Sequence, residues 1–227
     1  MPRHLLVTND FPPKVGGIQT YLWELWRRLD PNAVTVLATP HAGAAEFDAA
    51  APFEIRRTRD PVLLPHPALI RQVNRLAAEV DADLVVLDPA LPLGAIGPAL
   101  DRPYGLVLHG AEITLPGRLP LSSGALGAVL RRAELVIAAG GYPLAEAEHA
   151  AGSALPSVVV PPGVDVDRFV PRGRGAAPHH AHRRPDHPRR LPQQPLRALL
   201  PRHAERAGAD GRAHGHAHRL RHRARLA

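Results

Sequence analysis

The stretch VTNDFPPKVGGIQTYLWELWRRL, residues 7–29, carries the signals that decide the fold. It begins in an apolar run, passes through two prolines, and opens a helical pattern directly after Gly16 and Gly17. From Ile18 to Leu29, apolar side chains recur at steps of three and four, which places them on one face of a helix. A strand followed at once by an amphipathic helix is the first β-α unit of an α/β fold.

The same alternation continues to about residue 170. Short runs of Val, Leu and Ile, bounded by Gly, Pro, Asn and Asp, alternate with helical patterns. The predicted strands are residues 4–8, 33–38, 53–57, 84–87, 104–108, 135–139 and 157–160, and the predicted helices are residues 18–29, 68–80, 122–132 and 144–151. Several strands are apolar on both faces, as in a parallel sheet covered by helices on both sides. The sequence therefore predicts an α/β domain over residues 1–170, with a Rossmann-like, doubly wound parallel sheet.

The composition narrows the class of protein. The chain has 227 residues and no cysteine, so it can form neither a disulfide framework nor a thiolate metal site. No apolar run reaches the roughly 18 to 20 residues that span a bilayer, and the N-terminal residues lack a signal-peptide pattern. We therefore expect a cytoplasmic protein that is at most peripheral at the inner face of the plasma membrane.

The net charge of +7 is distributed very unevenly. Residues 171–227 contain 14 arginines, no lysine and three acidic residues, a net charge of +11, so residues 1–170 carry −4. The same segment holds nine of the 14 histidines and seven prolines, but no Val, Ile or aromatic residue. Such a composition cannot build a core, and we expect this tail to be disordered.

Three hypotheses account for the tail. Its arginines could bind phosphate polymers, and HGHAH at residues 214–218 could hold a transition metal, but both signals are non-specific. We expect neither a specific nucleic-acid partner nor a metal site. The third hypothesis, translation of a GC-rich gene in the wrong frame, accounts for more of the composition.

The glycine pair lies where ligands of open α/β sheets bind, beyond the carboxyl end of a parallel strand. We expect Pro12 and Pro13 to force an extended path, and Gly16 and Gly17 to free the first helix amides to face an anion such as phosphate. A tight turn with glycines that serve packing alone is the alternative. The G-x-G-x-x-G fingerprint is absent and no acidic residue ends the second predicted strand, so an NAD enzyme is disfavoured.

Three segments in this order resemble one family. FPPKVGGIQTYLWEL (residues 11–25), LHGAE (108–112) and VVVPPGVDVDRF (158–169) resemble the N-terminal half of retaining GT-B glycosyltransferases of the family 4 type, above all the actinobacterial phosphatidylinositol mannosyltransferases. The resemblance implies transfer of mannose from GDP-mannose to a phosphatidylinositol-mannoside lipid acceptor at a membrane surface, with no metal or other cofactor. It makes residues 1–170 the acceptor-side domain of a two-domain cleft. A different sugar donor or acceptor, and a non-catalytic nucleotide-binding module, remain alternatives.

The same resemblance assigns roles to individual residues. It places Gly16 and Gly17 by the donor diphosphate, Asp10, Ile18 and Gln19 on the acceptor side, and His109 as the catalytic residue against the transferred sugar, with Glu112 either orienting His109 or capping the next segment. A neutral imidazole can bond sugar hydroxyls and respond to developing charge. Without the resemblance, a single histidine after an apolar strand is more often structural.

The family pattern breaks off after PPGVDVDRF, which matches the hinge between the two domains. The second domain would supply a basic pair for the diphosphate and two glutamates spaced eight apart, yet residues 171–227 contain neither such a glutamate pair nor a lysine. We therefore expect a truncated enzyme with little or no activity alone; its oligomeric state is not predicted.

Residues 61–80 allow two interpretations. The segment is apolar and carries Arg71 and Arg75 on a predicted helix. It could lie on an acidic bilayer near a lipid acceptor, or it could be an ordinary sheet-covering helix.

Overall fold

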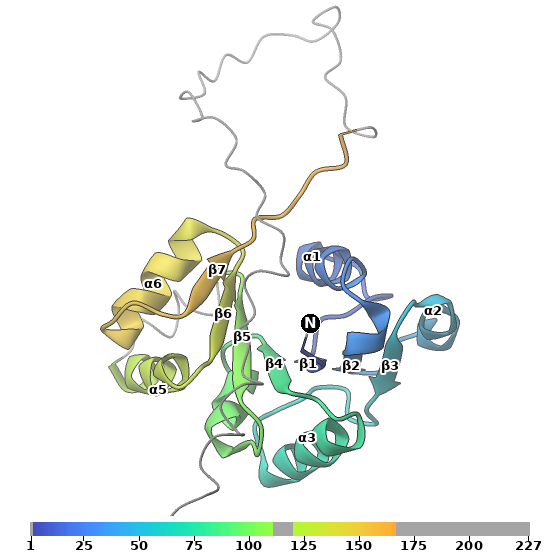
Figure 1. Ribbon diagram of the computed structural model, residues 1–227, viewed down its shortest axis with the longest axis horizontal. Helices are drawn as coiled ribbons and strands as arrows, with labels where there is room; N and C mark the ends of the chain where they lie inside the picture. Colours follow the sequence, from blue (N-terminus) through green and yellow to red (C-terminus); the bar gives the residue numbers. More distant parts are fainter. Residues whose placement is uncertain (1, 111–119, 167–227) are drawn as a thin grey trace, which may run out of the picture.

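The computed structural model describes residues 2–110 and 120–166 as one α/β sheet structure (Figure 1). Its strands are β1 (His4–Thr8), β2 (Val34–Ala38), β3 (Glu54–Arg57), β4 (Leu84–Asp88), β5 (Tyr104–Leu108), β6 (Leu135–Ala138) and β7 (Ser157–Val159). They pair in parallel in the order β3-β2-β1-β4-β5-β6-β7. The strand order reverses between β1 and β4, which is the point where open α/β sheets bind ligands.

Helices cover both faces of the sheet. They are α1 (Gly17–Trp26), α2 (Ala44–Ala50), α3 (Pro67–Glu79), α5 (Pro120–Arg131) and α6 (Gly141–Ala151), with short 3-10 helices η1 (Pro31–Ala33) and η2 (Leu93–Ala99). One core lies between the sheet and α3, η2, α5 and α6. A second core lies on the opposite face, under α1 and α2. Figure 1 shows α1 and α3 on opposite sides of the sheet, as a doubly wound fold requires.

The burial of the strands confirms the predicted sheet class. Every residue of β1, β2, β4, β5 and β6 is buried, whereas the edge strands β3 and β7 are partly exposed. All seven predicted strands are present, with ends that differ by a residue at most. Interior parallel strands need apolar side chains on both faces, and this is the pattern that the sequence shows.

The helices differ from the prediction in several places. The segments α2, η1 and η2 were not predicted, α1 ends early, and α5 and α6 begin at Pro120 and Gly141 rather than at residues 122 and 144. Helix α2 was not predicted because its apolar residues form no stripe: Ala44 is its one buried residue. The 3-10 helix η2, which contains Pro98, was also not predicted. Helix α1 ends at Trp26 rather than Leu29, and Arg27 caps it through a backbone bond to the carbonyl of Trp23.

Helix α3 resolves the two interpretations of residues 61–80. Its apolar residues Leu69, Val73 and Leu76 are buried in the core against the sheet, while Arg71 and Arg75 are exposed. The apolar face is therefore already packed, and α3 is the sheet-covering helix. In the part of the chain that the structure describes, no helix is both long and apolar enough to cross a bilayer.

Candidate active site at the carboxyl edge of the sheet

Three neighbouring strands bring polar residues together at the carboxyl edge of the sheet. Thr8 ends β1 and Asp88 ends β4, and the two residues are partners in the parallel register. His109 directly follows β5, which pairs with β4 on its other side. Side chains that are up to about 100 residues apart in the chain therefore meet at one place.

These residues form a hydrogen-bonded chain. The backbone N–H of Asp10 donates to Oγ1 of Thr8 over 2.8 Å. The hydroxyl of Thr8 in turn donates to Oδ2 of Asp88 over 2.6 Å. The other carboxyl oxygen of Asp88, Oδ1, lies 2.6 Å from Nε2 of His109. The catalytic histidine that the sequence predicts is thus attached to the sheet through a buried carboxyl group.

Asp88 is an unusual group to find in a core. Its side chain is only 1% exposed, and that of His109 is 10% exposed. Burial raises the pKa of the Asp88 carboxyl, and this outweighs the hydrogen bonds from His109 and Thr8, which oppose it. Both carboxyl oxygens have partners, so the buried group is fully hydrogen-bonded.

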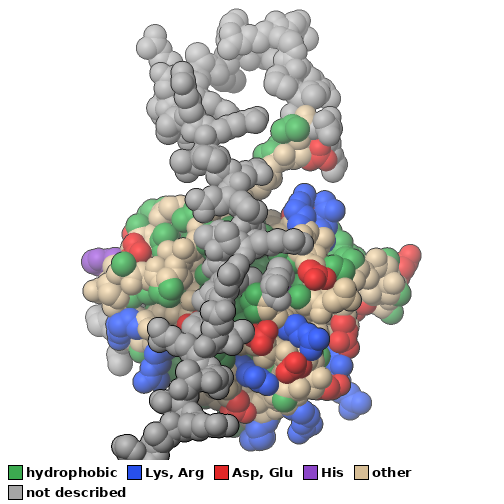
Figure 2. Space-filling model, viewed as in Figure 1, with side chains coloured by type: hydrophobic (Ala, Val, Ile, Leu, Met, Phe, Trp, Pro, Cys, Tyr) green, Lys and Arg blue, Asp and Glu red, His purple; other side chains and the backbone are tan. Residues whose placement is uncertain are grey.

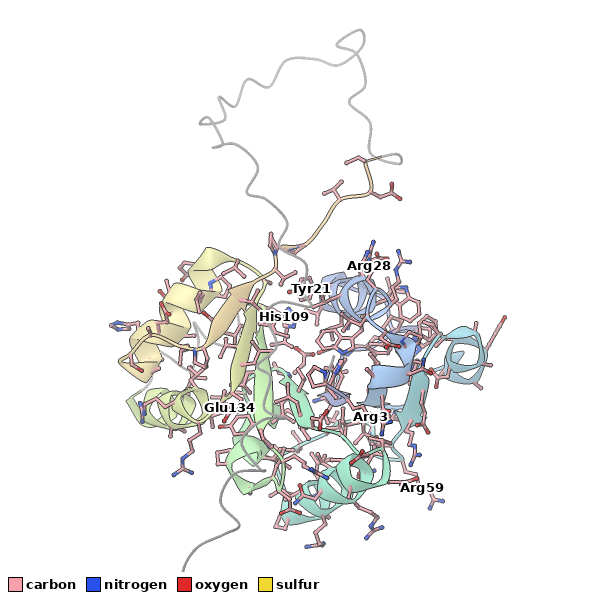
Figure 3. The ribbon with its side chains drawn as sticks, viewed as in Figure 1. Arg3, Tyr21, Arg28, Arg59, His109 and Glu134 are labelled. Carbon is pink, nitrogen blue, oxygen red and sulfur yellow. The ribbon has the colours of Figure 1, made fainter. Side chains whose placement is uncertain are left out.

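Tyr21 of α1 connects this chain to the first helix. Its ring meets the ring of His109 edge-on, with centroids 5.5 Å apart (Figure 3). Its hydroxyl donates to the carbonyl of Val160, just beyond β7, over 2.8 Å. Burial, with a smaller contribution from the negative charge of Asp88, raises the pKa of Tyr21 to about 12. Tyr21 therefore contacts the histidine and the residue directly before the predicted hinge, which begins at Pro161.

The two glycines play different structural roles. Gly16 is the N-cap of α1 and has extended backbone angles that any residue can adopt, so a need for unusual angles is not the reason for glycine there. A Cβ on Gly16 would lie 2.2 Å from Oε1 of Gln19, whereas a Cβ on Gly17 would have no atom within 4 Å. Glycine at position 16 therefore leaves room for the Gln19 side chain, whereas Gly17 borders open space.

That open space is a hollow of about 350 Å³. It is lined by Val15, Gly16, Gly17, Thr20, Tyr21, Glu24, Pro162 and Gly163. No side chain caps the first turn of α1, and that turn contains no acidic residue. Glu24, further along the helix, is paired with Arg27 and Arg28, which offsets its charge. The start of α1 therefore remains suited to an anion.

The residues that were predicted to meet the acceptor form a second small network. Oδ1 of Asp10 accepts from Nζ of Lys14 over 2.6 Å and from Nε2 of Gln19 over 2.7 Å. Gln19 is 6% exposed, and Ile18 packs at the edge of the core. Because the backbone of Asp10 bonds to Thr8, this network and the histidine chain share a residue.

Arg57 holds the proline segment in place. Its guanidinium donates to both carboxyl oxygens of Asp48 and to the carbonyls of Thr39 and Pro12. Pro12 and Pro13 form a turn rather than the extended path that was predicted. The peptide bond between Pro12 and Pro13 is cis, as in tight turns, and the carbonyl of Pro12 accepts a hydrogen bond from Arg57 of β3.

The family model for Glycosyltransferase Family 4 matches residues 15–168, which is more than half of the chain and includes α1, β4 and β5 of this edge. The chain belongs to glycosyltransferase family 4. It is 38% identical over 181 residues to the GDP-mannose-dependent alpha-(1-6)-phosphatidylinositol monomannoside mannosyltransferase of Mycobacterium tuberculosis, covering 75% of this chain and 47% of that protein. It is 33% identical over 175 residues to the GDP-mannose-dependent monoacylated alpha-(1-6)-phosphatidylinositol monomannoside mannosyltransferase of Corynebacterium glutamicum, covering 74% and 46%. The chain thus spans about half the length of these relatives.

The fold agrees with the family. The crystal structure of Anabaena Alr3699/HepE in complex with UDP-glucose superposes with a TM-score of 0.55 and 22% sequence identity, covering 74% of this chain and 45% of that one. The complex of the same protein with UDP gives a TM-score of 0.52. The predicted α/β, Rossmann-like sheet and the predicted family are both confirmed.

The structure of this family 4 chain brings most of the predicted site residues to one edge of the sheet. Gly16 and Gly17 line the hollow with Tyr21, and Tyr21 contacts His109. Asp10, Ile18 and Gln19 lie on or beside the loop that leads to α1. Glu112 and residues 171–227 lie outside the described residues, so their predicted roles stay predictions. Among the residues that are described, no group of three His, Asp or Glu side chains could hold a metal ion.

Sequence reasoning missed three residues of this site. Asp88 was left beyond the predicted end of its strand, Thr8 was treated only as a strand terminus, and Tyr21 was assigned only to the apolar face of α1. A polar residue at the carboxyl end of an interior parallel strand was the available signal, since this edge is where α/β sheets bind ligands.

Proposed function

We propose that residues 1–170 form the acceptor-side domain of a retaining glycosyltransferase, which transfers mannose from GDP-mannose to a phosphatidylinositol-mannoside lipid. Family membership and 33–38% identity to the mannosyltransferases named above support the proposal. The observation that carries it is the position of His109, which is bonded to buried Asp88 and touches Tyr21 beside the uncapped start of α1.

The predicted polar and glycine residues have these roles in the proposal, and Ile18 lies on the acceptor side beside Gln19. Amides at Gly16 and Gly17 meet the donor diphosphate, because the positive end of the α1 dipole favours an anion there. The imidazole of His109 bonds the transferred mannose, and Glu112 supports that segment. Asp10 and Gln19 meet the acceptor as a bonded pair, since the Gln19 amide already donates to Asp10.

The proposal requires no metal. Transfer with retention develops charge on the leaving diphosphate and on the sugar, and positioned hydrogen-bond donors and charges can stabilise both. In the family pattern, the groups for the diphosphate lie mostly after the hinge, and residues 171–227 do not show that pattern. We therefore infer that the 227-residue chain turns over GDP-mannose far more slowly than its longer relatives.

The proposed transfer reaction also indicates which partners the chain binds. The donor is a sugar nucleotide, and a lipid acceptor would be reached at a membrane surface, which fits a cytoplasmic protein that binds the membrane peripherally. Lys and Arg side chains lie interspersed with Asp and Glu on the lower part of the face shown in Figure 2, which fits the net charge of −4 over residues 1–170. This mixture does not favour nucleic acid as the partner of the sheet domain.

Ligand-observed NMR with the purified chain tests the proposal. We expect saturation transfer from the protein to the mannose and guanosine protons of GDP-mannose, and weaker transfer to UDP-glucose at equal concentration. A transfer assay with phosphatidylinositol monomannoside in vesicles, run beside the Mycobacterium tuberculosis relative, measures turnover. Preferential binding of UDP-glucose would refute the assignment of the donor, and turnover equal to that of the relative would refute the inferred loss of activity.

A further inference from the structure

We propose that Tyr21 is a positioning residue: its hydroxyl fixes the segment that leaves the sheet after β7, and so holds one wall of the hollow beside α1. The inference deepens the proposed function, and it rests on that function where ligand binding is concerned. Neither the family match nor the names of the relatives assign a role to this residue. The inference is carried by one hydrogen bond, by the lining of the hollow and by two prolines that follow Val160.

The hollow exists because two segments far apart in the chain lie side by side. Six of its lining residues, from Val15 to Glu24, belong to α1 and to the two positions before it, whereas Pro162 and Gly163 come from the segment after β7. A helix is a cylinder with a convex surface, so α1 alone encloses no volume. The shape of the hollow therefore depends on where residues 162–163 are held.

Val160 is bonded on both sides just before this segment leaves the sheet. Its N–H donates to the carbonyl of Ala138, the last residue of β6, and its carbonyl accepts from the Tyr21 hydroxyl, each over 2.8 Å. The next two residues are prolines, which have no N–H and cannot extend the ladder. Within the described part of the chain, no hydrogen bond joins residues 161–164 to the sheet or to α1. The Tyr21 bond is thus what ties this segment to the first helix.

Tyr21 is itself firmly held, as an anchor requires. The residue is 8% exposed and belongs to the core under α1. Its ring packs edge-on against the ring of His109, which limits how far the phenol can swing (Figure 3). Burial raises the pKa of Tyr21 to about 12, so the hydroxyl keeps its proton and can donate it at neutral pH.

Tyr104 offers a matched comparison elsewhere in the domain. Its hydroxyl also donates to a backbone carbonyl, that of Val129 in α5, over 2.6 Å. Burial likewise raises the pKa of Tyr104 to about 12. Tyr104 begins β5, so it lies at the amino edge of the sheet and does not line the hollow. Replacing either tyrosine by phenylalanine removes a similar bond, but the change at Tyr21 alone should release the segment after β7.

The consequence for binding rests on the proposed function. If the diphosphate of GDP-mannose lies at the start of α1, residues 162–163 form the second wall of its site. A ligand that needs this wall in place loses affinity by the fraction of molecules in which the wall is displaced. One ordinary hydrogen bond changes such an equilibrium by about fivefold. Tyr21→Phe should therefore raise the Kd for GDP-mannose by up to about fivefold.

Backbone NMR on the intact, ¹⁵N-labelled chain tests the anchor without any ligand. Solvent exchange of the Val160 amide reports opening of the segment, and the heteronuclear NOE of Gly163 and Val164 reports fast motion. In Tyr21→Phe we expect faster exchange at Val160 and lower NOE values at Gly163 and Val164, whereas Tyr104→Phe should leave all three unchanged. Equal values in the three proteins, or an equal change in Tyr104→Phe, would overturn the proposal.

A measurement on the unaltered chain keeps the test valid if Tyr21→Phe does not fold. A hydroxyl proton that is buried and bonded to a carbonyl exchanges slowly with water. We therefore expect hydroxyl signals from Tyr21 and Tyr104 at neutral pH, but none from Tyr142, which is 61% exposed. The Tyr21 hydroxyl should show an NOE to protons of Val160. A chain that gives the Tyr104 signal and lacks the Tyr21 signal would overturn the proposal.

Titration with GDP-mannose separates this inference from the proposed function. Weaker binding to Tyr21→Phe, with unchanged binding to Tyr104→Phe, would support both. A segment that loosens in Tyr21→Phe, in a protein that does not bind GDP-mannose in its unaltered form, would support the anchor and count against the proposed function. A loosened segment with unchanged affinity would overturn the role of Tyr21 in the ligand site.

Discussion

Nε2 of His109 lies 2.6 Å from Oδ1 of Asp88, at the ends of two neighbouring strands in the middle of the sheet. The histidine is half-buried at the edge where ligands bind, and this bond attaches it to a carboxyl group inside the core. Its orientation therefore depends on strand pairing rather than on a loop. Single substitutions can measure how these residues, and the loop before α1, contribute to the free energy of unfolding and to ligand binding.

Replacing Asp88 by alanine should destabilise the fold. The change leaves the hydroxyl of Thr8 and the imidazole of His109 without their partner in a buried place, and an unsatisfied buried polar group costs about 1 to 3 kcal/mol. Urea unfolding followed by circular dichroism measures the free energy of unfolding. Asp101→Ala is the exposed control and should change it by less than about 0.5 kcal/mol. An equal effect of both changes would show that the buried network does not contribute.

The two glycines should respond in opposite ways to alanine. In Gly16→Ala the new Cβ would displace the end of the Gln19 side chain from its hydrogen bond to Asp10, which costs about 1 kcal/mol. Gly17→Ala meets no protein atom and replaces glycine in the first turn of a helix, so its free energy of unfolding should stay the same or rise.

Gly17 should matter for ligand binding rather than for stability. Because its Cβ would project into space beside the hollow, Gly17→Ala should weaken binding of GDP-mannose while the fold is unaffected.

A double-mutant cycle checks the reason given for Gly16: in the Gln19→Ala background, Gly16→Ala should lower the free energy of unfolding by less than it does alone. The same cost in both backgrounds would contradict the predicted clash.

Arg57 and its neighbour Arg56 form a natural comparison. Arg57 is 13% exposed and donates four hydrogen bonds to three groups, including the carbonyl of Pro12, so Arg57→Ala should lower the free energy of unfolding by about 2 kcal/mol. The ion pairs of Arg56 with Glu54 and Glu79 are exposed, so Arg56→Ala should cost about 1 kcal/mol or less. Thermal unfolding of the two variants, prepared in parallel, distinguishes these outcomes. A larger loss of stability for Arg56→Ala would contradict the role of Arg57 in holding the Pro12 segment.

Tyr21 should make stability depend on alkaline pH. Its pKa in the folded protein is raised from 10.0 to about 12, so the folded state holds the proton more tightly than the unfolded state does. This contribution is complete below pH 10 and is lost as the pH rises through about 12, and it amounts to about 3 kcal/mol at most. Comparing Tyr21→Phe with the unaltered chain across this range isolates Tyr21, because Tyr104 is present in both. A constant difference between the two proteins would contradict the shift.

The sheet could be predicted from the sequence because its interior strands are apolar on both faces. Residues 104–108, for example, read YGLVL and form β5 with the predicted bounds. Helix α3 has a clear stripe that includes Leu69, Val73 and Leu76, and it was found within one residue at each end. Helix α2 has no such stripe, since it lies at the rim of the sheet and buries little.

The site was predictable only in part, for a physical reason. Gly16, Gly17 and His109 lie in short motifs that can be recognised along the chain. The bond between Thr8 and Asp88 joins residues 80 positions apart and depends on the register of β1 against β4. Nothing in the local sequence LVVLD shows that its last residue is buried and bonded to a histidine that directly follows the neighbouring strand β5.

The central claim is that the start of α1 and His109 form one sugar-nucleotide site, and amide NMR during titration with GDP-mannose tests it most directly. We predict saturable shifts of the backbone amide signals of Gly16, Gly17 and His109, with the largest shifts at the glycines, and smaller shifts with GDP alone at His109. GDP-mannose that shifts signals elsewhere in the sheet domain, while these three stay unchanged, would contradict the account.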